Sequence, residues 1–213
     1  MCGRFVLLID LSEIVETFQI GEVAAAYRAG SNISPGEQIL AVVRNKDVNK
    51  LVEFRWGLIP SWAKDPAIGY KTINARAETI TEKPSFMEAF KRRRCVIPAD
   101  GFYEWQKSGK AKKPFRLFLK SGRSFGFAGL YDSWVSPEKK RIDTCTIITT
   151  AANELTAPLH DRMPVILPKD KETYWMDPGN TDQKGLLALL KPYPSDEMAM
   201  SEVDSKTFTV SRK

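Results

Sequence analysis

The feature that most constrains the fold is a series of short apolar segments, rich in β-branched and aromatic residues, in the middle of the chain. They occupy residues 95–97, 101–106, 115–119, 124–130 and 144–149, with Lys-Ser-Gly turns at 107–109 and 120–122. Short runs of this kind, bounded by turn residues, predict β-strands, and tight turns join antiparallel neighbours. We therefore predict a predominantly antiparallel β body.

Further strands and several short helices are predicted around this body. The additional strands lie at residues 39–43, 51–56 and 163–167, and the first two form a hairpin. Helical spacing of apolar residues occurs at residues 12–21, capped by Ser12, and at 84–90, 169–176 and 181–190. The predicted fold class is α+β, with the helices at the periphery.

Length and composition predict a single domain. The chain has 213 residues, of which 43% are hydrophobic and 27% charged, and no Pro/Gly/Ser-rich linker divides residues 1–213. The net charge is +6, and basic residues cluster at 91–94, 107–113 and 139–141. These clusters fit either a polyanionic partner or an ordinary solvated surface, and charge alone leaves both open.

Cysteine and histidine usage argues against metal chemistry. Three cysteines without a CxxC pair, and one histidine, cannot supply a usual zinc site or a disulfide framework, which predicts a cytosolic protein without metal or cofactor. The apolar start at residues 5–9 is too short for a signal or membrane segment, and Asp10 interrupts it. The sequence also contains no Gly-rich phosphate loop.

The second residue offers distinctive chemistry once Met1 is removed, because Cys2 then carries both an α-amine and a thiol. The amine has a pKa of about 7.7–8.0 and the thiol one of about 8.5, so both nucleophiles are partly available at neutral pH. On an aldehyde, the amine forms an imine that the thiol closes into a five-membered thiazolidine. The simpler alternative is that Cys2 has no role beyond its position.

Residues 72–79 alternate polar and small side chains, so in an extended segment Asn74, Arg76 and Glu78 would share one face. One interpretation is an asparagine that orients a nucleophile beside an arginine that holds an anion. The alternatives are a solvated strand face and an internal Arg76–Glu78 ion pair.

Glu104 and His160 are candidates for proton transfer. Glu104 lies between Tyr103 and Trp105, where burial would raise its pKa toward the range of a general acid or base; an exposed strand glutamate is the alternative. His160 is the single histidine and lies in a charged loop before an apolar strand. It can serve as the base for Cys2 if the fold joins them, although a lone histidine is more often structural.

Residues 55–64 combine aromatic, proline and basic side chains at a predicted strand end. That mixture suits stacking on unpaired bases with phosphate contacts nearby. We assign Trp56 to the core and Trp62, which follows Pro60, to an exposed platform.

Six segments, in this order along the chain, together resemble one protein family. They are Cys2-Gly3-Arg4-Phe5, Asn32-Ile33-Ser34-Pro35-Gly36, Arg55-Trp56-Gly57-Leu58-Ile59-Pro60-Ser61-Trp62, Asn74-Ala75-Arg76-Ala77-Glu78-Thr79, Asp100-Gly101-Phe102-Tyr103-Glu104-Trp105 and Leu159-His160-Asp161-Arg162-Met163-Pro164. The resemblance is to the SRAP family, the SOS-response-associated peptidase-like proteins that process abasic sites, and it covers residues 2 to about 168.

The resemblance implies a function on damaged DNA. Met1 would be removed, and Cys2 would capture the ring-opened aldehyde of an abasic site in single-stranded DNA as a thiazolidine crosslink that shields the lesion. A persistent imine would give weak lyase activity by β-elimination, and the peptidase label would refer to removal of whatever precedes Cys2. We expect a monomeric, cytoplasmic protein of bacterial or phage origin that associates with the nucleoid when DNA is damaged.

The resemblance also implies a role for each site residue. Asn74 would position Cys2 and the lesion, Glu104 would relay protons during Schiff-base formation, and His160 would assist ring opening and crosslink reversal. Phosphates would be held by Arg4, Arg76 and Arg162, and the gap in the strand would be shaped by Pro35 and Trp62.

The end of the chain departs from the family pattern, and two other functions stay open. The pattern usually continues past the Val203 region with an Asn- and Pro-containing stretch, so we expect a shortened closing segment. One alternative function is an amino-terminal-nucleophile amidohydrolase, since glutamine amidotransferases of that kind also begin Met-Cys-Gly; their His- and Gly-rich motifs are absent here. The other is a non-catalytic reader of modified or single-stranded DNA.

Overall fold

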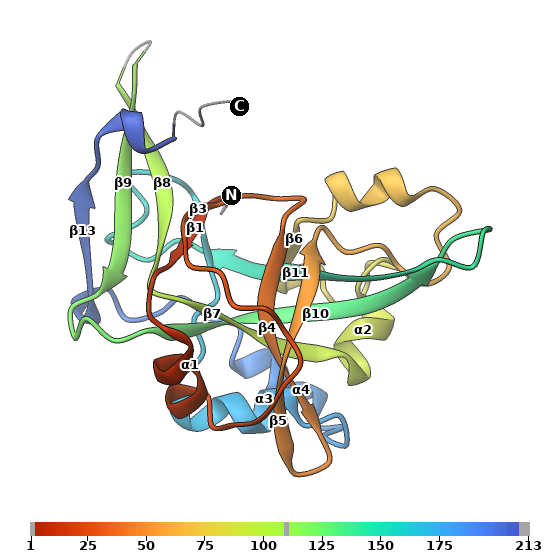
Figure 1. Cartoon of the computed structure of the whole chain (residues 1–213). Helices are drawn as coiled ribbons and strands as arrows, with labels where there is room; N and C mark the ends of the chain where they lie inside the picture. The colour runs from red at the N-terminus through yellow and green to blue at the C-terminus, as the bar shows by residue number, and fades with distance from the viewer. Residues whose placement is uncertain (1–2, 109–110, 209–213) are drawn as a thin grey trace.

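Two β-sheets that share an apolar core make up the described part of this computed structural model, residues 3–108 and 111–208 (Figure 1). Phe5 of the first sheet packs its ring 5.5 Å from Trp56 and 5.9 Å from Phe127, both in the second sheet. All three side chains are almost completely buried, so the first strand of the chain helps to join the two sheets.

The small sheet has the strand order β13-β9-β8-β1-β3, and every neighbouring pair is antiparallel. Its strands are β1 (Phe5–Leu7), β3 (Gly30–Ile33), β8 (Gly101–Ser108), β9 (Ala111–Leu119) and β13 (Met198–Glu202). Because β1 lies between β8 and β3, the beginning of the described chain enters the sheet directly.

The large sheet has the order β12-β11-β10-β7-β4-β5-β2, with β6 attached to β11. Its strands are β2 (Ile20–Val23), β4 (Gln38–Asn45), β5 (Val48–Trp56), β6 (Asn74–Arg76), β7 (Arg94–Ala99), β10 (Phe125–Val135), β11 (Arg141–Ala151) and β12 (Arg162–Pro164). A parallel pairing of β5 with β11 closes the strands from β11 to β5 into a ring. The predominantly antiparallel body is confirmed; the parallel pairs of β11 with β5 and β6, and of β2 with β5, were not predicted.

Short helices surround the sheets, as the α+β prediction requires (Figure 1). The α-helices are α1 (Leu11–Thr17), α2 (Met87–Arg92), α3 (Glu172–Met176) and α4 (Gln183–Ala188). The 3-10 helices are η1 (Pro66–Tyr70), η2 (Ala77–Thr79), η3 (Lys169–Lys171), η4 (Ser195–Glu197) and η5 (Ser205–Phe208). Within the described residues, none of these helices combines the length and apolar character needed to span a membrane.

The first helix differs from its prediction at both ends. Asp10, not Ser12, is the N-cap, because its carboxylate accepts a backbone hydrogen bond from the first turn at 2.9 Å. The Ser12 hydroxyl donates to the same carboxylate at 2.5 Å. The helix ends at Thr17 rather than near residue 21, since Gln19 takes a positive φ of 50° and turns the chain into β2.

The strand predicted at residues 163–167 is shorter than expected and spans Arg162–Pro164. The reason is a change of partner after Pro164. The Val165 N–H donates to Ile148 of β11 at 2.9 Å, while its carbonyl accepts from Ala128 of β10, also at 2.9 Å. The segment therefore passes from one strand to the next instead of extending either ladder.

Arg94 is a buried cation, only 1% exposed, at the start of β7. Its guanidinium donates to main-chain carbonyls at the ends of two helices, those of Phe90, Lys91, Trp175, Asp177 and Asn180. The last carbonyls of a helix lack intrahelical partners, so one side chain satisfies the ends of α2 and α3 together.

Replacing Arg94 by methionine should lower the free energy of unfolding by about 3 kcal/mol or more, because several buried carbonyls lose a charged donor. Urea unfolding followed by circular dichroism measures the change. The matched control is Arg92→Met at the exposed end of α2, for which we expect a change below about 0.5 kcal/mol. Equal effects of the two substitutions would contradict the assigned role of Arg94.

Candidate functional site

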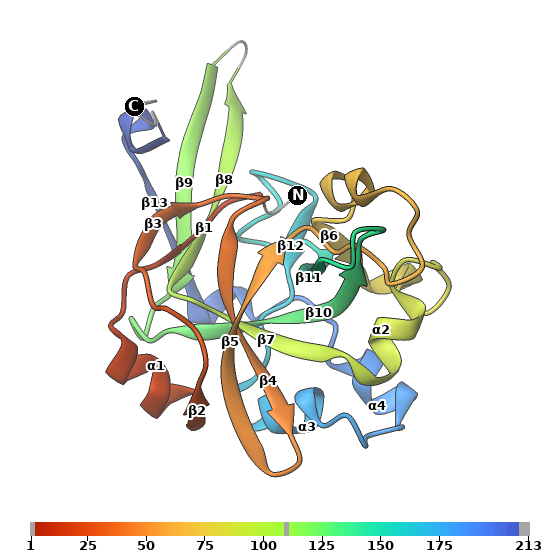
Figure 2. The same cartoon turned by 45° about the vertical axis from the view of Figure 1, so that its right-hand side comes forward.

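The end of β11 brings together predicted site residues from two distant parts of the chain. On one edge, β6 pairs in parallel, with Asn74 opposite Ile147 and Arg76 opposite Thr149. On the other edge, β12 pairs antiparallel, with Arg162 opposite Ala151. Figure 2 shows β6, β11 and β12 side by side. The ladder therefore places the asparagine and both arginines around one strand end.

Arg162 is nine-tenths buried and is held by the carboxylate of Glu78. Its Nη1 and Nη2 donate to the two Glu78 oxygens at 2.7 and 2.9 Å, and Nη2 also donates to the Thr149 carbonyl at 2.6 Å. The hydrogen bond from Arg162 holds the pKa of Glu78 below its usual value, and the charge of Arg76 acts in the same direction. A two-pronged contact of this kind fixes the guanidinium plane.

The prediction that Asn74, Arg76 and Glu78 share one extended face is wrong for Glu78. The strand ends at Arg76, and Glu78 lies in the 3-10 helix η2, which turns its carboxylate toward Arg162. The alternative of an internal Arg76–Glu78 ion pair is not what the structure has, because Glu78 pairs with the distant Arg162. Arg76 is exposed and Asn74 is half-buried.

Glu104 is a buried carboxylate on β8, with 4% of its surface exposed. Burial raises its pKa above 4.5, and the negative charge of Asp161 raises it further. The sequence prediction of a desolvated Glu104 is therefore confirmed. Tyr103 and Trp105 alternate with it along the strand and project from the other face of β8. The influence of Asp161 also shows that the loop carrying His160 lies within electrostatic reach of Glu104.

His160 lies between β11 and β12, one residue before Asp161. Its Nδ1 is 3.0 Å from the backbone N–H of Arg162 and 2.7 Å from the Asp161 carboxylate. In the neutral ring, Nδ1 accepts from Arg162 and Nε2 carries the proton; in the protonated ring, Nδ1–H donates to Asp161. Both protonation states thus have a partner in place, which suits a group that exchanges protons.

Arg4 lies beside the Glu104 strand at the start of the described chain. Its carbonyl accepts from the backbone N–H of Tyr103 at 2.9 Å, and its Nη1 donates to Asn32 at 2.6 Å. Met1 and Cys2 lie outside the described residues. The proposed meeting of Cys2 with Asn74, Glu104 and His160 therefore stays a prediction.

The two tryptophans occupy the environments predicted for them. Trp56 is 1% exposed and its Nε1 donates to the Ile73 carbonyl at 2.8 Å, whereas Trp62 is 56% exposed. Pro35 is exposed in the turn between β3 and β4, next to Gly36, whose N–H donates to the Trp56 carbonyl at 2.8 Å. The Pro35 turn is thus attached to the end of β5, which leads into the Trp62 segment.

Three contributors to this region were missed at the sequence level. Asn32 holds Arg4, Thr149 holds Arg162, and Asp132 accepts from the Ser61 N–H at 3.0 Å, fixing the turn before Trp62. Asp132 carried a usable signal, because it is a lone acid within the long apolar strand β10. Asn32 and Thr149 carried none, since their partners are distant in sequence.

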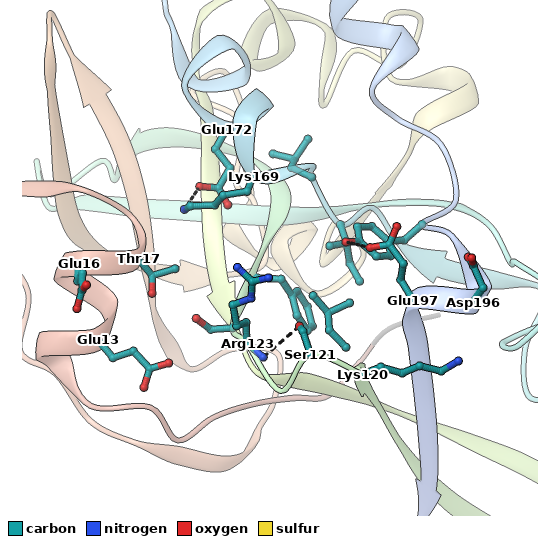
Figure 3. Close-up of a pocket in the computed structure, with 16 residues that line it drawn as sticks. Glu13, Glu16, Thr17, Lys120, Ser121, Arg123, Lys169, Glu172, Asp196 and Glu197 are labelled. Carbon is teal, nitrogen blue, oxygen red and sulfur yellow. Dashed lines mark hydrogen bonds and ion pairs between the residues drawn. The ribbon is translucent and has the colours of Figure 1, made fainter.

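A cavity of about 570 Å³ lies elsewhere, between α1, the β9–β10 turn and α3. None of the predicted site residues lines it. Figure 3 shows Arg123 in its centre, between the acidic residues of α1 and those of η4. Glu172 is 5% exposed at its wall and accepts from Lys169 at 2.5 Å; burial raises the pKa of Glu172 to about 7.

The chain is similar to a known family along almost its whole length. A family model described as "SOS response associated peptidase (SRAP)" matches residues 1–210. Proteins named "Abasic site processing protein YoqW", from Bacillus subtilis (strain 168) and from Bacillus phage SPbeta, are each 49% identical over 208 residues, covering 96% of this chain and 93% of the relative. "Abasic site processing protein HMCES" of Xenopus tropicalis is 36% identical over 165 residues, 67% of this chain and 49% of that protein.

Solved structures share the fold. A crystal structure of a Bacteroides thetaiotaomicron protein has a TM-score of 0.89 and 27% identity, covering 96% of this chain and 93% of that one. A Bordetella bronchiseptica protein has a TM-score of 0.82 and 25% identity, covering 95% of this chain and 100% of that one. The arrangement of two sheets and peripheral helices is therefore common to these proteins.

The buried Glu172 should make stability depend on pH. Its pKa is raised in the folded state, so its contribution to stability is complete below about pH 4.5 and is lost as the pH rises to about 7, by about 3 kcal/mol in total. The free energy of unfolding of Glu172→Gln minus that of the native chain should therefore increase by about 3 kcal/mol between pH 4.5 and pH 7. Glu16→Gln, at the exposed rim, is the control, and a flat difference for Glu172→Gln would refute the assignment.

Proposed function

Because this chain belongs to the SOS response associated peptidase (SRAP) family, we propose that it senses abasic sites in single-stranded DNA and captures them covalently through Cys2 after removal of Met1. The names of the relatives from Bacillus subtilis, phage SPbeta and Xenopus tropicalis, all abasic site processing proteins, support a lesion of this kind as the substrate. Residues 1–213 would form one domain, as the family match over residues 1–210 supports.

The observation that supports the proposal is that Asn74 and the His160 loop lie beside the same strand, with Glu104 within electrostatic reach of that loop. Asn74 and the His160 loop lie on the two edges of β11, and Asp161 of that loop influences Glu104 of β8. The described chain begins beside Glu104, through the hydrogen bond of Tyr103 to Arg4. A nucleophile at residue 2 would therefore start next to this group of side chains.

In the proposed reaction, the α-amine of Cys2 adds to the aldehyde carbon and water leaves, giving an imine. The Cys2 sulfur then adds to the imine carbon, and the thiol proton passes to the nitrogen, closing the thiazolidine. Glu104 suits the transfer of protons in the first step because burial raises its pKa. His160 would assist opening of the sugar ring and reversal of the crosslink, and Asn74 would position Cys2 and the aldehyde.

The DNA strand would be held by its phosphates and opened at the lesion. Arg76 is exposed and could contact a phosphate, and Arg162 would share its guanidinium between a phosphate and the Glu78 carboxylate, which already accepts two hydrogen bonds from it. Arg4 would hold a phosphate on the side of the small sheet, while Pro35 and Trp62 would shape the gap in the strand. Contacts of this kind with the DNA phosphates would raise the local concentration of the rare open-chain aldehyde at Cys2.

Several finer properties belong to the same proposal. Crosslinking would shield the lesion in the DNA damage response, an unclosed imine would allow weak β-elimination, and the chain would expose Cys2 by its own peptidase activity. The protein would act as a monomer in the cytoplasm, and would associate with the nucleoid when DNA is damaged.

Crosslinking to single-stranded DNA that contains an abasic site should be visible as a species that survives denaturing electrophoresis. Cys2→Ala and Cys2→Ser should each abolish it, because neither side chain can close the thiazolidine. Both variants keep the α-amine, so borohydride should still trap an imine on the DNA with either of them. The crosslinking proposal fails if native protein gives no such species or if Cys2→Ala leaves its yield unchanged. In that case, a noncovalent complex would favour the reader, and glutaminase activity would favour the amidohydrolase.

Glu104→Gln should slow crosslink formation by roughly 100-fold or more, the usual contribution of a general acid or base. The native rate should fall as the pH rises through the raised pKa of Glu104, since the protonated acid is then lost, and the variant should lack this limb. Single-turnover crosslinking from pH 4.5 to 9 measures both effects. Glu53→Gln, an exposed glutamate on β5, is the control; an unchanged rate and pH profile in Glu104→Gln would exclude the assigned role.

A further inference from the structure

The guanidinium of Arg4 is held between two parts of the chain that lie far from it in sequence. Asn32 of β3 accepts a hydrogen bond from Arg4 Nη1 at 2.6 Å. The Cζ atom of Arg4 lies 5.8 Å from the centre of the Phe208 ring, within the range of a cation–π contact. Arg4 is half-buried in this arrangement, so its charge is oriented while part of its surface is open.

Phe208 is itself held in place by the small sheet. Its ring packs edge-on against Tyr103, with the ring centres 4.8 Å apart and the planes at 88°, and lies 5.1 Å from the ring of Trp105. Tyr103 is 4% exposed, and its hydroxyl donates to the Ser31 carbonyl at 2.8 Å. Aromatic contacts in this edge-to-face geometry are favourable, so Phe208 helps to dock η5 on β8.

The Phe208 cluster lies on the opposite face of β8 from Glu104. Tyr103 and Trp105 alternate with Glu104 along the strand, and successive side chains of a strand point to opposite faces. A residue in this cluster is therefore separated from the proposed proton-transfer groups by the strand itself. Its influence would act on binding of the DNA backbone rather than on the covalent step.

We propose that Phe208 and Asn32 are positioning residues that hold Arg4 ready for a DNA phosphate, which makes η5 part of the DNA-binding surface. The inference rests on the proposed phosphate contact of Arg4. An arginine side chain loses rotamer entropy when it is fixed in one conformation. Contacts that fix Arg4 before DNA arrives remove this entropy loss from the binding step. Phe208 would thereby strengthen DNA binding without contacting the DNA itself.

The test measures noncovalent binding to single-stranded DNA without an abasic site, by fluorescence anisotropy at several salt concentrations. Phe208→Ala should weaken binding about two- to fivefold, the effect of an exposed cation–π contact. Arg4→Ala should weaken binding more and lower the slope of log K against log salt by about 0.7, because one phosphate contact is lost. In the Arg4→Ala background, Phe208→Ala should have no further effect, since it acts through Arg4.

Two controls separate positioning from general stability. Phe118→Ala removes a matched pair on β9 of the same sheet, where the Arg116 Cζ lies 5.6 Å from the ring centre, and should leave DNA binding unchanged. Phe208→Tyr keeps the ring and should restore native affinity. At saturating abasic DNA, Phe208→Ala should crosslink at the native rate.

The inference would be overturned if Phe208→Ala lowered DNA affinity equally in the native chain and in the Arg4→Ala variant. It would also be overturned if Phe208→Ala lowered the affinity in neither background. Native DNA binding by Arg4→Ala would overturn it as well. The crosslink of native Cys2 is measured separately, so failure of this inference is distinguishable from failure of the proposed function.

Discussion

The pairing of β11 with four other strands is the constraint on which the rest of the structure depends. β11 bonds to β10 and β12 in antiparallel ladders and to β5 and β6 in parallel ones, so it closes the large sheet and carries both halves of the candidate site. The closure requires close main-chain approach where β5 ends. Gly57 has a φ of 132°, and its N–H donates to the Cys145 carbonyl at 2.8 Å. A Cβ at Gly57 would lie 2.6 Å from the carbonyl oxygen of Gly69 in η1, so a side chain at residue 57 would push η1 away from the end of β5.

Three buried ionisable side chains show how differently this fold uses burial. Arg94 is surrounded by carbonyls from two helix ends and serves packing. Arg162 is held by Glu78 and Thr149, which fixes the strand that follows His160. Glu104 differs from the two arginines, because burial raises its pKa and so favours the protonated form. Glu172 shares this upward shift far from the candidate site, so the direction of a pKa shift identifies a proton-transfer candidate only together with its location.

Local patterns in the sequence predicted the long strands well, because a strand of eight or more residues with a tight turn carries its own signal. The hairpin of β4 and β5 is the clearest case. The short strands β1, β3 and β6 were not identified as strands. They have three or four residues, and their pairing depends on distant partners, such as Phe5 with Ile33 and with Phe102.

The same limit applied to the site. The burial of Glu104 was predicted from its aromatic neighbours, whereas the pairing of Glu78 with Arg162, 84 residues apart, has no local signal.

The position of β1 limits where chemistry at the amino terminus can occur. Phe5 is 1% exposed, lies between β8 and β3 and packs against Trp56 and Phe127, so it is fixed within the core. Residue 2 is three residues away, and three extended residues span at most about 10 Å. If Cys2 is the nucleophile, as we propose, the aldehyde must come to the protein within that distance of Phe5. A strand of DNA could do so, because an unpaired nucleotide can be turned out of its stack. Under this proposal the core that fixes β1 would require the lesion to move to the amino terminus, and not the reverse.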